Sequence, residues 1–149
     1  FKKSGKTTVV TSIINALAKK GYSVSSAKSI HIDDFSLETE GTDTYKHYVA
    51  GAKRVGLSYP KGKAILYYDQ DTNNFLDKFD SDYLILEGFR EYQCPKILCA
   101  KSEEDLAKDI QDEVFCISGL ISEKLKEYNG VPIIHYKEID KIVKMIEEL

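Results

Sequence analysis

Phe1-Lys2-Lys3-Ser4-Gly5-Lys6-Thr7-Thr8 opens the chain and ends in the Gly-Lys-Thr sequence that closes a P-loop. The full P-loop pattern is a glycine, four residues and then Gly-Lys-Ser/Thr, so its leading glycine falls one position before Phe1. In such a loop the lysine reaches the β- and γ-phosphates, the hydroxyl residue ligates Mg²⁺, and backbone N–H groups hold phosphate oxygens. The segment therefore predicts a phosphate loop, and its predicted nucleotide-binding residues are Lys3, Ser4, Gly5, Lys6, Thr7 and Thr8.

A helix is predicted directly after this loop. Apolar residues recur at helical spacing from Val9 to Leu17, and Gly21 stands where a glycine often ends a helix. A P-loop is the turn between a buried strand and a helix. We therefore expect at least one strand and the first glycine of the loop to lie upstream of Phe1.

Composition limits the classes of protein that fit. A length of 149 residues, 42% of them hydrophobic, suits one domain with its own core, and we expect a single nucleotide-binding domain over residues 1–149. The net charge of −3 gives no indication of nucleic-acid binding, and no apolar run reaches membrane-spanning length. The three cysteines have no CxxC spacing, which favours free buried thiols and a cytoplasmic location over a disulfide framework.

Strand-like and helix-like segments alternate along the rest of the chain. Strands are predicted over residues 21–28, 83–86, 96–100, 114–118 and 131–135, and helices over 43–52, 71–79, 122–128 and 137–149. Two further strand-like runs, 53–59 and 63–69, flank the turn Pro60-Lys61-Gly62 and predict an antiparallel hairpin. The pattern predicts an α/β fold of the P-loop NTPase type, with three αβα layers and a mostly parallel sheet that carries an inserted antiparallel hairpin.

Glu87 is the second feature that indicates chemistry. It ends the apolar run Tyr83-Leu84-Ile85-Leu86, which is typical of a buried parallel strand. Ligands of open α/β sheets bind beyond the carboxyl ends of the strands, so Thr7 and Glu87 should meet at one edge. We expect both to ligate Mg²⁺ and Glu87 to be catalytic, as the acid of a Walker B element. The alternative is an ordinary surface glutamate at a strand end.

Asp33 and Asp34 follow the strand at 21–28, in a segment that also holds His31. An acid there would lie at the same edge of the sheet, and we assign Asp33 a catalytic role near Mg²⁺. The residues alone do not decide between Asp33 and Asp34, and two adjacent acids in a loop are as often simply solvated.

Ala100-Lys101-Ser102-Glu103 is a weak match to the Asn/Thr-Lys-x-Asp loop with which many GTP-binding folds read guanine. The alternative is the start of a helix, with Ser102 as its N-cap and acids in its first turn. The sequence favours this alternative and leaves the choice between guanine and adenine open.

With these segments in hand, the chain resembles the molybdopterin-guanine dinucleotide biosynthesis adaptor family, MobB. The resemblance rests on Ser4-Gly5-Lys6-Thr7-Thr8, on Gly21-Tyr22-Ser23-Val24 followed by Lys28, His31 and Asp33, and on Glu87-Gly88-Phe89-Arg90 with Pro95-Lys96-Ile97. Above all it rests on the block from Thr39 to Ala52. That block, TEGTDTYKHYVAGA, is similar to the family pattern T-P-G-K-D-S-x-R-H-x-x-A-G-A. It departs from the pattern at Glu40, which replaces proline, and at Thr42, which replaces lysine.

The resemblance implies a homodimeric GTP-binding protein that uses GTP and Mg²⁺, hydrolyses GTP slowly and assists a MobA-type guanylyltransferase that acts on molybdenum cofactor. It also draws attention to His31, Asp43, Lys46 and His47 as contacts for an anion, either phosphate or the pterin phosphate of a bound cofactor. For Lys46 and His47 the alternative is a partly exposed polar helix face.

Two other functions stay open at this point. A P-loop small-molecule kinase would transfer the γ-phosphoryl group to a metabolite, but a kinase lid is usually rich in arginine and the chain has only Arg54 and Arg90. A non-catalytic interaction domain with a vestigial loop is the third possibility, and the intact Lys6, Thr7 and Glu87 argue against it.

Overall fold

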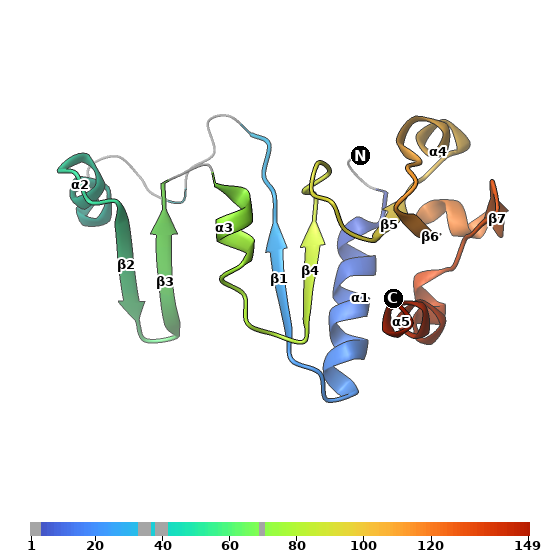
Figure 1. The fold of residues 1–149 in the computed structure, drawn as a ribbon, viewed down its shortest axis with the longest axis horizontal. Helices are drawn as coiled ribbons and strands as arrows, with labels where there is room; N and C mark the ends of the chain where they lie inside the picture. Colours follow the sequence, from blue (N-terminus) through green and yellow to red (C-terminus); the bar gives the residue numbers. More distant parts are fainter. Residues whose placement is uncertain (1–3, 33–36, 38–41, 69–70) are drawn as a thin grey trace. The chain divides into compact units, whose positions relative to one another are not determined.

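A computed structural model describes residues 4–32, 37, 42–68 and 71–149 of the chain. The chain divides into two compact units, Phe1–Ser29 with Phe79–Leu149 as the first and Ile30–Lys78 as the second (Figure 1). Each unit is described by itself below.

A parallel strand pair forms one part of the first unit. β1 (Val24–Lys28) runs parallel to β4 (Tyr83–Glu87), in a register that pairs Val24 with Tyr83 and Lys28 with Glu87. The pair is fixed at its amino end, where the Ser23 N–H donates to the Asp82 carboxylate and the Asp82 N–H donates to the Ser23 hydroxyl, both at 2.8 Å. The carboxyl ends of the strands therefore bring Lys28 and Glu87 side by side.

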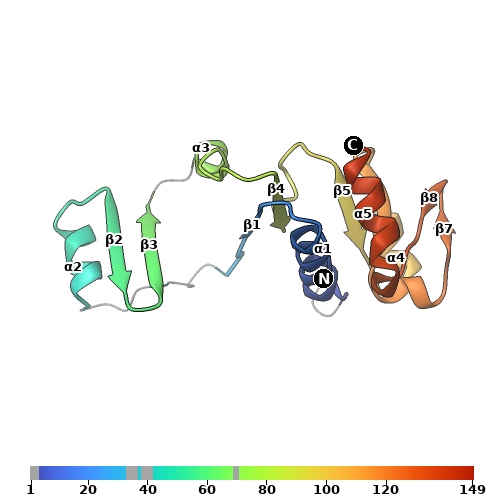
Figure 2. The ribbon, with the colours of Figure 1, turned by 90° about the horizontal axis from the view of Figure 1, so that it is seen from below.

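A second parallel pair, β5 (Lys96–Cys99) with β6 (Val114–Ser118), carries helices on both of its faces. α1 (Lys6–Lys19) and α5 (Ile139–Glu147) pack against each other (Figure 2). Their apolar residues share a core with Cys116. The next residue, Ile117, belongs to a second core with α4 (Glu103–Asp109) and η1 (Leu120–Glu123). Because neighbouring strand residues point to opposite faces, the two cores lie on opposite sides of the strands. The predicted αβα layering is confirmed.

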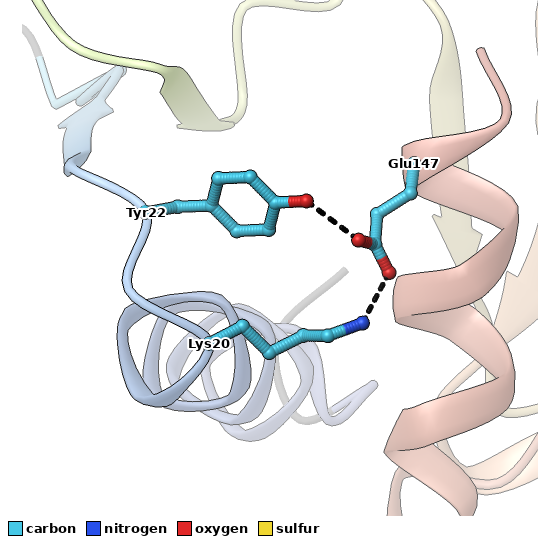
Figure 3. Close-up of polar contacts among 3 residues, drawn as sticks. All are labelled: Lys20, Tyr22 and Glu147. Carbon is cyan, nitrogen blue, oxygen red and sulfur yellow. Dashed lines mark hydrogen bonds and ion pairs between the residues drawn. The ribbon is translucent and has the colours of Figure 1, made fainter.

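The two helices of the first layer are joined to β1 by a polar cluster (Figure 3). Tyr22, just before β1, donates a hydrogen bond of 2.6 Å to the Glu147 carboxylate near the end of α5. Lys20, which caps the carboxyl end of α1, forms an ion pair with the same carboxylate. The Tyr22 ring also meets Tyr83 edge to face, with 5.1 Å between centroids. One carboxylate thus connects α1, β1 and α5.

A cavity of about 600 Å³ lies between the two strand pairs of the first unit. Within the described residues, β4 pairs only with β1 and β5 pairs only with β6. The lining is largely apolar and includes Val9, Val10 and Ile13 of α1, Leu84 and Leu86 of β4, and Ile97 of β5. The prediction that β4 is a parallel strand is confirmed, but the prediction that it is buried is wrong. All five β4 residues are only half-buried because they border this cavity.

The second unit is built on the predicted hairpin, which is confirmed. β2 (Arg54–Tyr59) and β3 (Gly62–Tyr67) pair antiparallel around Pro60 and Lys61. α2 (Asp43–Val49) contacts β2, and Tyr48 of α2 stacks on Tyr68 with 3.9 Å between ring centroids. α3 (Thr72–Leu76) is shorter than predicted and begins where the Asp71 carboxylate caps the Asn74 N–H.

The predicted helix over residues 122–128 is wrong. The 3₁₀ turn η1 ends at Glu123, and β7 (Glu127–Tyr128) then pairs antiparallel with β8 (Val131–Pro132). Asn129 and Gly130 connect them with φ of 50° and 79°, and two consecutive positive φ angles are what a type I′ hairpin turn requires. The Asn-Gly dipeptide was the signal for this hairpin, and the helical spacing of neighbouring residues concealed it.

The predicted last strand shortens to β8, followed by a single parallel bridge between Ile133 and Ile117. The last helix is preceded by a 3₁₀ turn, η2 (Tyr136–Glu138). Of the helices in the described ranges, none combines the length and the apolar character that crossing a membrane requires.

Candidate functional site

The described part of the phosphate loop turns at Gly5 into the start of α1. Gly5 has φ of 88°, in the left-handed region that glycine adopts without strain, and it is the N-cap of the helix. No side chain among the described residues caps this end, and the first intrahelical bond runs from the Val9 N–H to the Gly5 carbonyl at 3.1 Å. The N–H groups of Lys6, Thr7 and Thr8 thus precede the first intrahelical bond, in the position that binds anions at a helix N-terminus.

The loop is held from behind by the segment that follows β6. The Leu120 N–H donates a 3.2 Å hydrogen bond to the carbonyl of Ser4, which is 1% exposed. The Ile121 N–H donates to the Ala100 carbonyl at 2.9 Å, and Gly119 lies between these contacts. A Cβ at Gly119 would stand 2.3 Å from the Ser4 oxygen and 2.9 Å from the Ala100 oxygen, so only glycine fits. Sequence reasoning missed Gly119, for which a glycine directly after a strand was the available signal.

Thr7 and Glu87 meet, as the sequence predicted from the shared edge of the sheet. The Thr7 hydroxyl, in the first turn of α1, donates a 3.1 Å hydrogen bond to Oε1 of Glu87 at the end of β4. The Glu87 side chain is 13% exposed. A hydroxyl and a carboxylate are hard oxygen donors of the kind that Mg²⁺ takes, and so this pair fits the metal that the sequence predicts.

The backbone after Glu87 is tightly constrained. The Glu87 carbonyl accepts a 2.9 Å hydrogen bond from the Ser29 N–H, and Gly88 follows with φ of 86°. A Cβ at Gly88 would lie 3.0 Å from the Cβ of Ser29. Phe89 then also has a positive φ, 54°, which is uncommon for a residue with a side chain. The chain therefore turns sharply away at the sheet edge and leaves the Glu87 carboxylate facing the phosphate loop.

Lys28 is a third side chain at this edge, and sequence reasoning did not assign it to the site. Its Nζ lies 3.6 Å from Oε1 of Glu87, the same oxygen that accepts the Thr7 hydroxyl. The Lys28 side chain is 60% exposed, and Lys6, at the first position of α1, is half-buried.

Several other predicted site residues are not brought to this edge by any described contact. Lys3 and Asp33 lie outside the described residues. The remaining candidates belong to the second unit and are exposed: His31, Asp43, Lys46 and His47. Lys46 lies 3.9 Å from the Asp43 carboxylate, one helical turn away on α2. Contact of these four residues with an anion stays a prediction. Within the described ranges, no three His, Cys, Asp or Glu side chains gather into a metal-binding cluster.

The segment after β5 is a helix start, as the alternative interpretation held. The Ser102 hydroxyl accepts the Asp105 N–H at 3.3 Å and caps α4, whose first turn is acidic. The Asp105 carboxylate, 7% exposed, accepts the Lys101 N–H at 3.1 Å. These groups hold the loop between β5 and α4, beside the segment that supports Ser4.

The three cysteines are free thiols, as predicted. Burial raises the pKa of Cys99 to about 12 and the pKa of Cys116 to about 11. Both therefore stay protonated near neutral pH and pack as small apolar residues in the core under α1 and α5.

Comparison with known proteins agrees with this arrangement. The family model for molybdopterin guanine dinucleotide synthesis protein B, MobB, matches residues 1–121. A probable molybdopterin-guanine dinucleotide biosynthesis adapter protein of Bacillus subtilis is 27% identical, over 91% of this chain and 81% of the relative. A putative adapter protein of the same description from Methanocaldococcus jannaschii is 30% identical, over 99% of this chain and 58% of the relative.

Solved structures of MobB proteins share the fold. The crystal structure of Bacillus subtilis MobB superposes with a TM-score of 0.80 at 24% identity, covering 100% of this chain and 93% of that one. A MobB homologue from Bacillus stearothermophilus superposes with a TM-score of 0.69 at 18% identity, covering 99% of this chain and 91% of that one. These likenesses confirm the predicted P-loop NTPase fold, and the family match over most of the chain shows that it belongs to the MobB family of molybdopterin guanine dinucleotide biosynthesis adapters.

Proposed function

We propose that the chain binds Mg²⁺–GTP at the phosphate loop and hydrolyses it slowly, as an adaptor in molybdopterin guanine dinucleotide biosynthesis. The observation that carries the nucleotide proposal is the 3.1 Å hydrogen bond from Thr7 to Glu87, beside an α1 N-terminus that no described side chain caps. It brings together two motifs that are 80 positions apart and that act together at the Mg²⁺ and phosphates of P-loop NTPases.

Each residue has a defined role in this proposal. The N–H groups at the start of α1 hold phosphate oxygens, and the Lys6 ammonium neutralises the β- and γ-phosphates. Thr7 and Glu87 hold Mg²⁺, which supplies charge neutralisation at the phosphates when it is bound. Glu87 also orients a water molecule near the terminal phosphate, because its carboxylate is fixed at the sheet edge by the turn at Gly88.

Support for guanine and for the partner comes from the family. The relatives are described as molybdopterin-guanine dinucleotide biosynthesis adapter proteins, and a guanine nucleotide is a component of that product. We propose that the partner is a MobA-type guanylyltransferase, and that the chain acts as a cytoplasmic homodimer.

Titration calorimetry with Mg²⁺–GTP and Mg²⁺–ATP tests the proposal. We expect GTP to bind more tightly and Lys6→Ala to abolish binding, while Lys19→Ala at the other end of α1 leaves it unchanged. Tighter ATP binding would contradict the guanine assignment and retain the phosphate site. Equal affinity of the Lys6→Ala variant and the wild type would show that this loop is not the phosphate-binding site.

A further inference from the structure

The contacts around α1 give the phosphate loop a direction across the sheet edge. Its first described residue, Ser4, is bound to Leu120 and lies beside Gly119, after β6. Its last part, Thr7, is bound to Glu87 at the end of β4. The loop thus runs from the β5–β6 pair toward the β1–β4 pair. The metal-ligating hydroxyl marks the end where the β- and γ-phosphates lie in a P-loop site.

Lys28 lies at that end. It is paired with Glu87 in the parallel register of β1 and β4, and paired residues of neighbouring strands point to the same face of a sheet. Glu87 faces α1, because its Oε1 accepts the hydroxyl of Thr7. The 3.6 Å contact between Lys28 Nζ and the same Oε1 shows that the Lys28 side chain also faces α1.

The charge balance at this point leaves the Lys28 ammonium able to serve a ligand. It is a long, flexible side chain, 60% exposed, and its contact with Glu87 is at the outer limit of an ion pair. The Lys28 end of this pair is in water while the Glu87 carboxylate is largely buried, and so the flexible lysine side chain can turn its ammonium toward a phosphate nearby. The ammonium has three N–H donors, so it can donate to a phosphate oxygen nearby while it stays beside Glu87.

We propose that Lys28 binds the terminal phosphate of the nucleotide and makes the site discriminate triphosphate from diphosphate. The inference rests on the proposed nucleotide site, and it adds a second lysine that enters from β1 rather than from the phosphate loop. Lys6 approaches the phosphates from α1. Lys28 approaches the terminal phosphate from the end of β1, which lies on the side of Glu87 that faces away from the β5–β6 pair. In a diphosphate complex Lys28 would keep only its contact with Glu87.

The test compares GTP and GDP affinities of wild type, Lys28→Met, Lys28→Arg and the control Lys19→Met, with Mg²⁺ and with EDTA. Methionine keeps most of the aliphatic length and removes the charge. We expect Lys28→Met to weaken the affinity for GTP by about tenfold or more, which corresponds to one lost charge-assisted contact. The affinity for GDP should stay within about twofold of the wild-type value. Lys28→Arg should restore most of the GTP affinity, and Lys19→Met should change neither nucleotide.

The EDTA arm separates direct contact from an effect through Glu87. If the Lys28 ammonium contacts phosphate directly, Lys28→Met still weakens GTP binding more than GDP binding when EDTA removes Mg²⁺. If Lys28 acts only by positioning Glu87, this difference between the two nucleotides disappears without the metal. Equal weakening of GTP and GDP, or a loss seen only with Mg²⁺, would overturn the proposal while leaving nucleotide binding intact. A wild-type protein that binds neither nucleotide would instead overturn the proposed function. Thermal unfolding of each variant checks that it is folded.

Discussion

Oε1 of Glu87 contacts two side chains: it accepts a 3.1 Å hydrogen bond from the hydroxyl of Thr7, and the Lys28 ammonium lies 3.6 Å from it. Thr7 comes from the first turn of α1 and Lys28 from the end of β1, so Glu87 connects the helix of the phosphate loop to the strand beside β4. The proposed Mg²⁺ site and the contact with the Lys28 ammonium therefore share one carboxylate oxygen.

Glu87→Gln should retain nucleotide binding and slow GTP hydrolysis. The amide preserves the length of the side chain and can still accept from Thr7, but it carries no charge to hold Mg²⁺ or to orient water. Calorimetry gives the affinity and phosphate release gives the turnover. Turnover at the wild-type rate would remove Glu87 from the mechanism. Asp82→Asn, at the other end of the same strand, is the matched control, since the Asp82 carboxylate accepts from the Ser23 N–H at the amino end of the strand pair.

Lys6→Ala should nearly abolish triphosphate binding while the protein stays folded. Lys6 is half-buried at the first helical position and lies in none of the described core clusters. One charge-assisted contact is worth about 1.5–3 kcal/mol, so losing contacts with two phosphates weakens binding by roughly a hundredfold or more. Unchanged affinity, with an unchanged circular dichroism spectrum, would show that the loop is not a phosphate site.

Thr7 and Glu87 could be predicted to meet because the motifs that contain them indicate where each residue lies in a parallel sheet. Gly5-Lys6-Thr7 and the apolar run before Glu87 each imply a place at the carboxyl edge of the sheet, and parallel topology brings them together. Lys28 was among the residues that carry the family resemblance, but nothing in the sequence placed it at the site, because a lysine at a strand end is ordinary. Its place beside Glu87 became visible only through the register of β1 and β4.

Helical spacing failed where local turn chemistry was stronger. Residues 122–128 have an apolar pattern compatible with a helix, but Asn129 and Gly130 adopt the positive φ angles of a tight hairpin and draw Glu127 and Tyr128 into β7. A two-residue turn of this type sets the antiparallel pairing of the residues on both sides of it, whereas a seven-residue helix is only marginally stable without tertiary contacts.

Gly119→Ala should weaken nucleotide binding far more than Gly130→Ala. Both glycines have a positive φ, 87° and 79°, so both substitutions strain the backbone, and the strain is larger at Gly119, where ψ of −160° falls in a region that is essentially restricted to glycine. Only at Gly119 would the new Cβ collide, 2.3 Å from the carbonyl oxygen of Ser4, whereas nothing lies within 4 Å at Gly130. Urea unfolding and GTP titration of both variants measure the two effects. If both variants bind GTP alike, the contact behind the loop does not shape the phosphate site.

Tyr22 should make the protein lose stability at alkaline pH. Its hydrogen bond to Glu147 raises the pKa of Tyr22 to about 12, from an ordinary value of 10.0. A raised pKa means that the folded state holds the proton more tightly. The stabilisation is therefore complete below pH 10 and is lost as pH rises through about 12. The hydrogen bond from Lys20, and after it the one from Tyr22, lower the pKa of Glu147 from its ordinary value of 4.5. The contribution of the ionised Glu147 carboxylate to folding stability is therefore present above pH 4.5 and is lost at lower pH.

Tyr22→Phe tests this assignment, because phenylalanine keeps the ring and its edge-to-face contact with Tyr83 while removing the hydroxyl. Urea unfolding of wild type and Tyr22→Phe is measured at intervals from pH 8 to pH 12. We expect the wild type to be the more stable at pH 8 and its advantage to shrink steadily between pH 10 and pH 12. Tyr128→Phe, remote from Glu147 in the described contacts, should track the wild type over the same interval. A constant difference between wild type and Tyr22→Phe across this range would show that the Tyr22–Glu147 hydrogen bond does not control the titration.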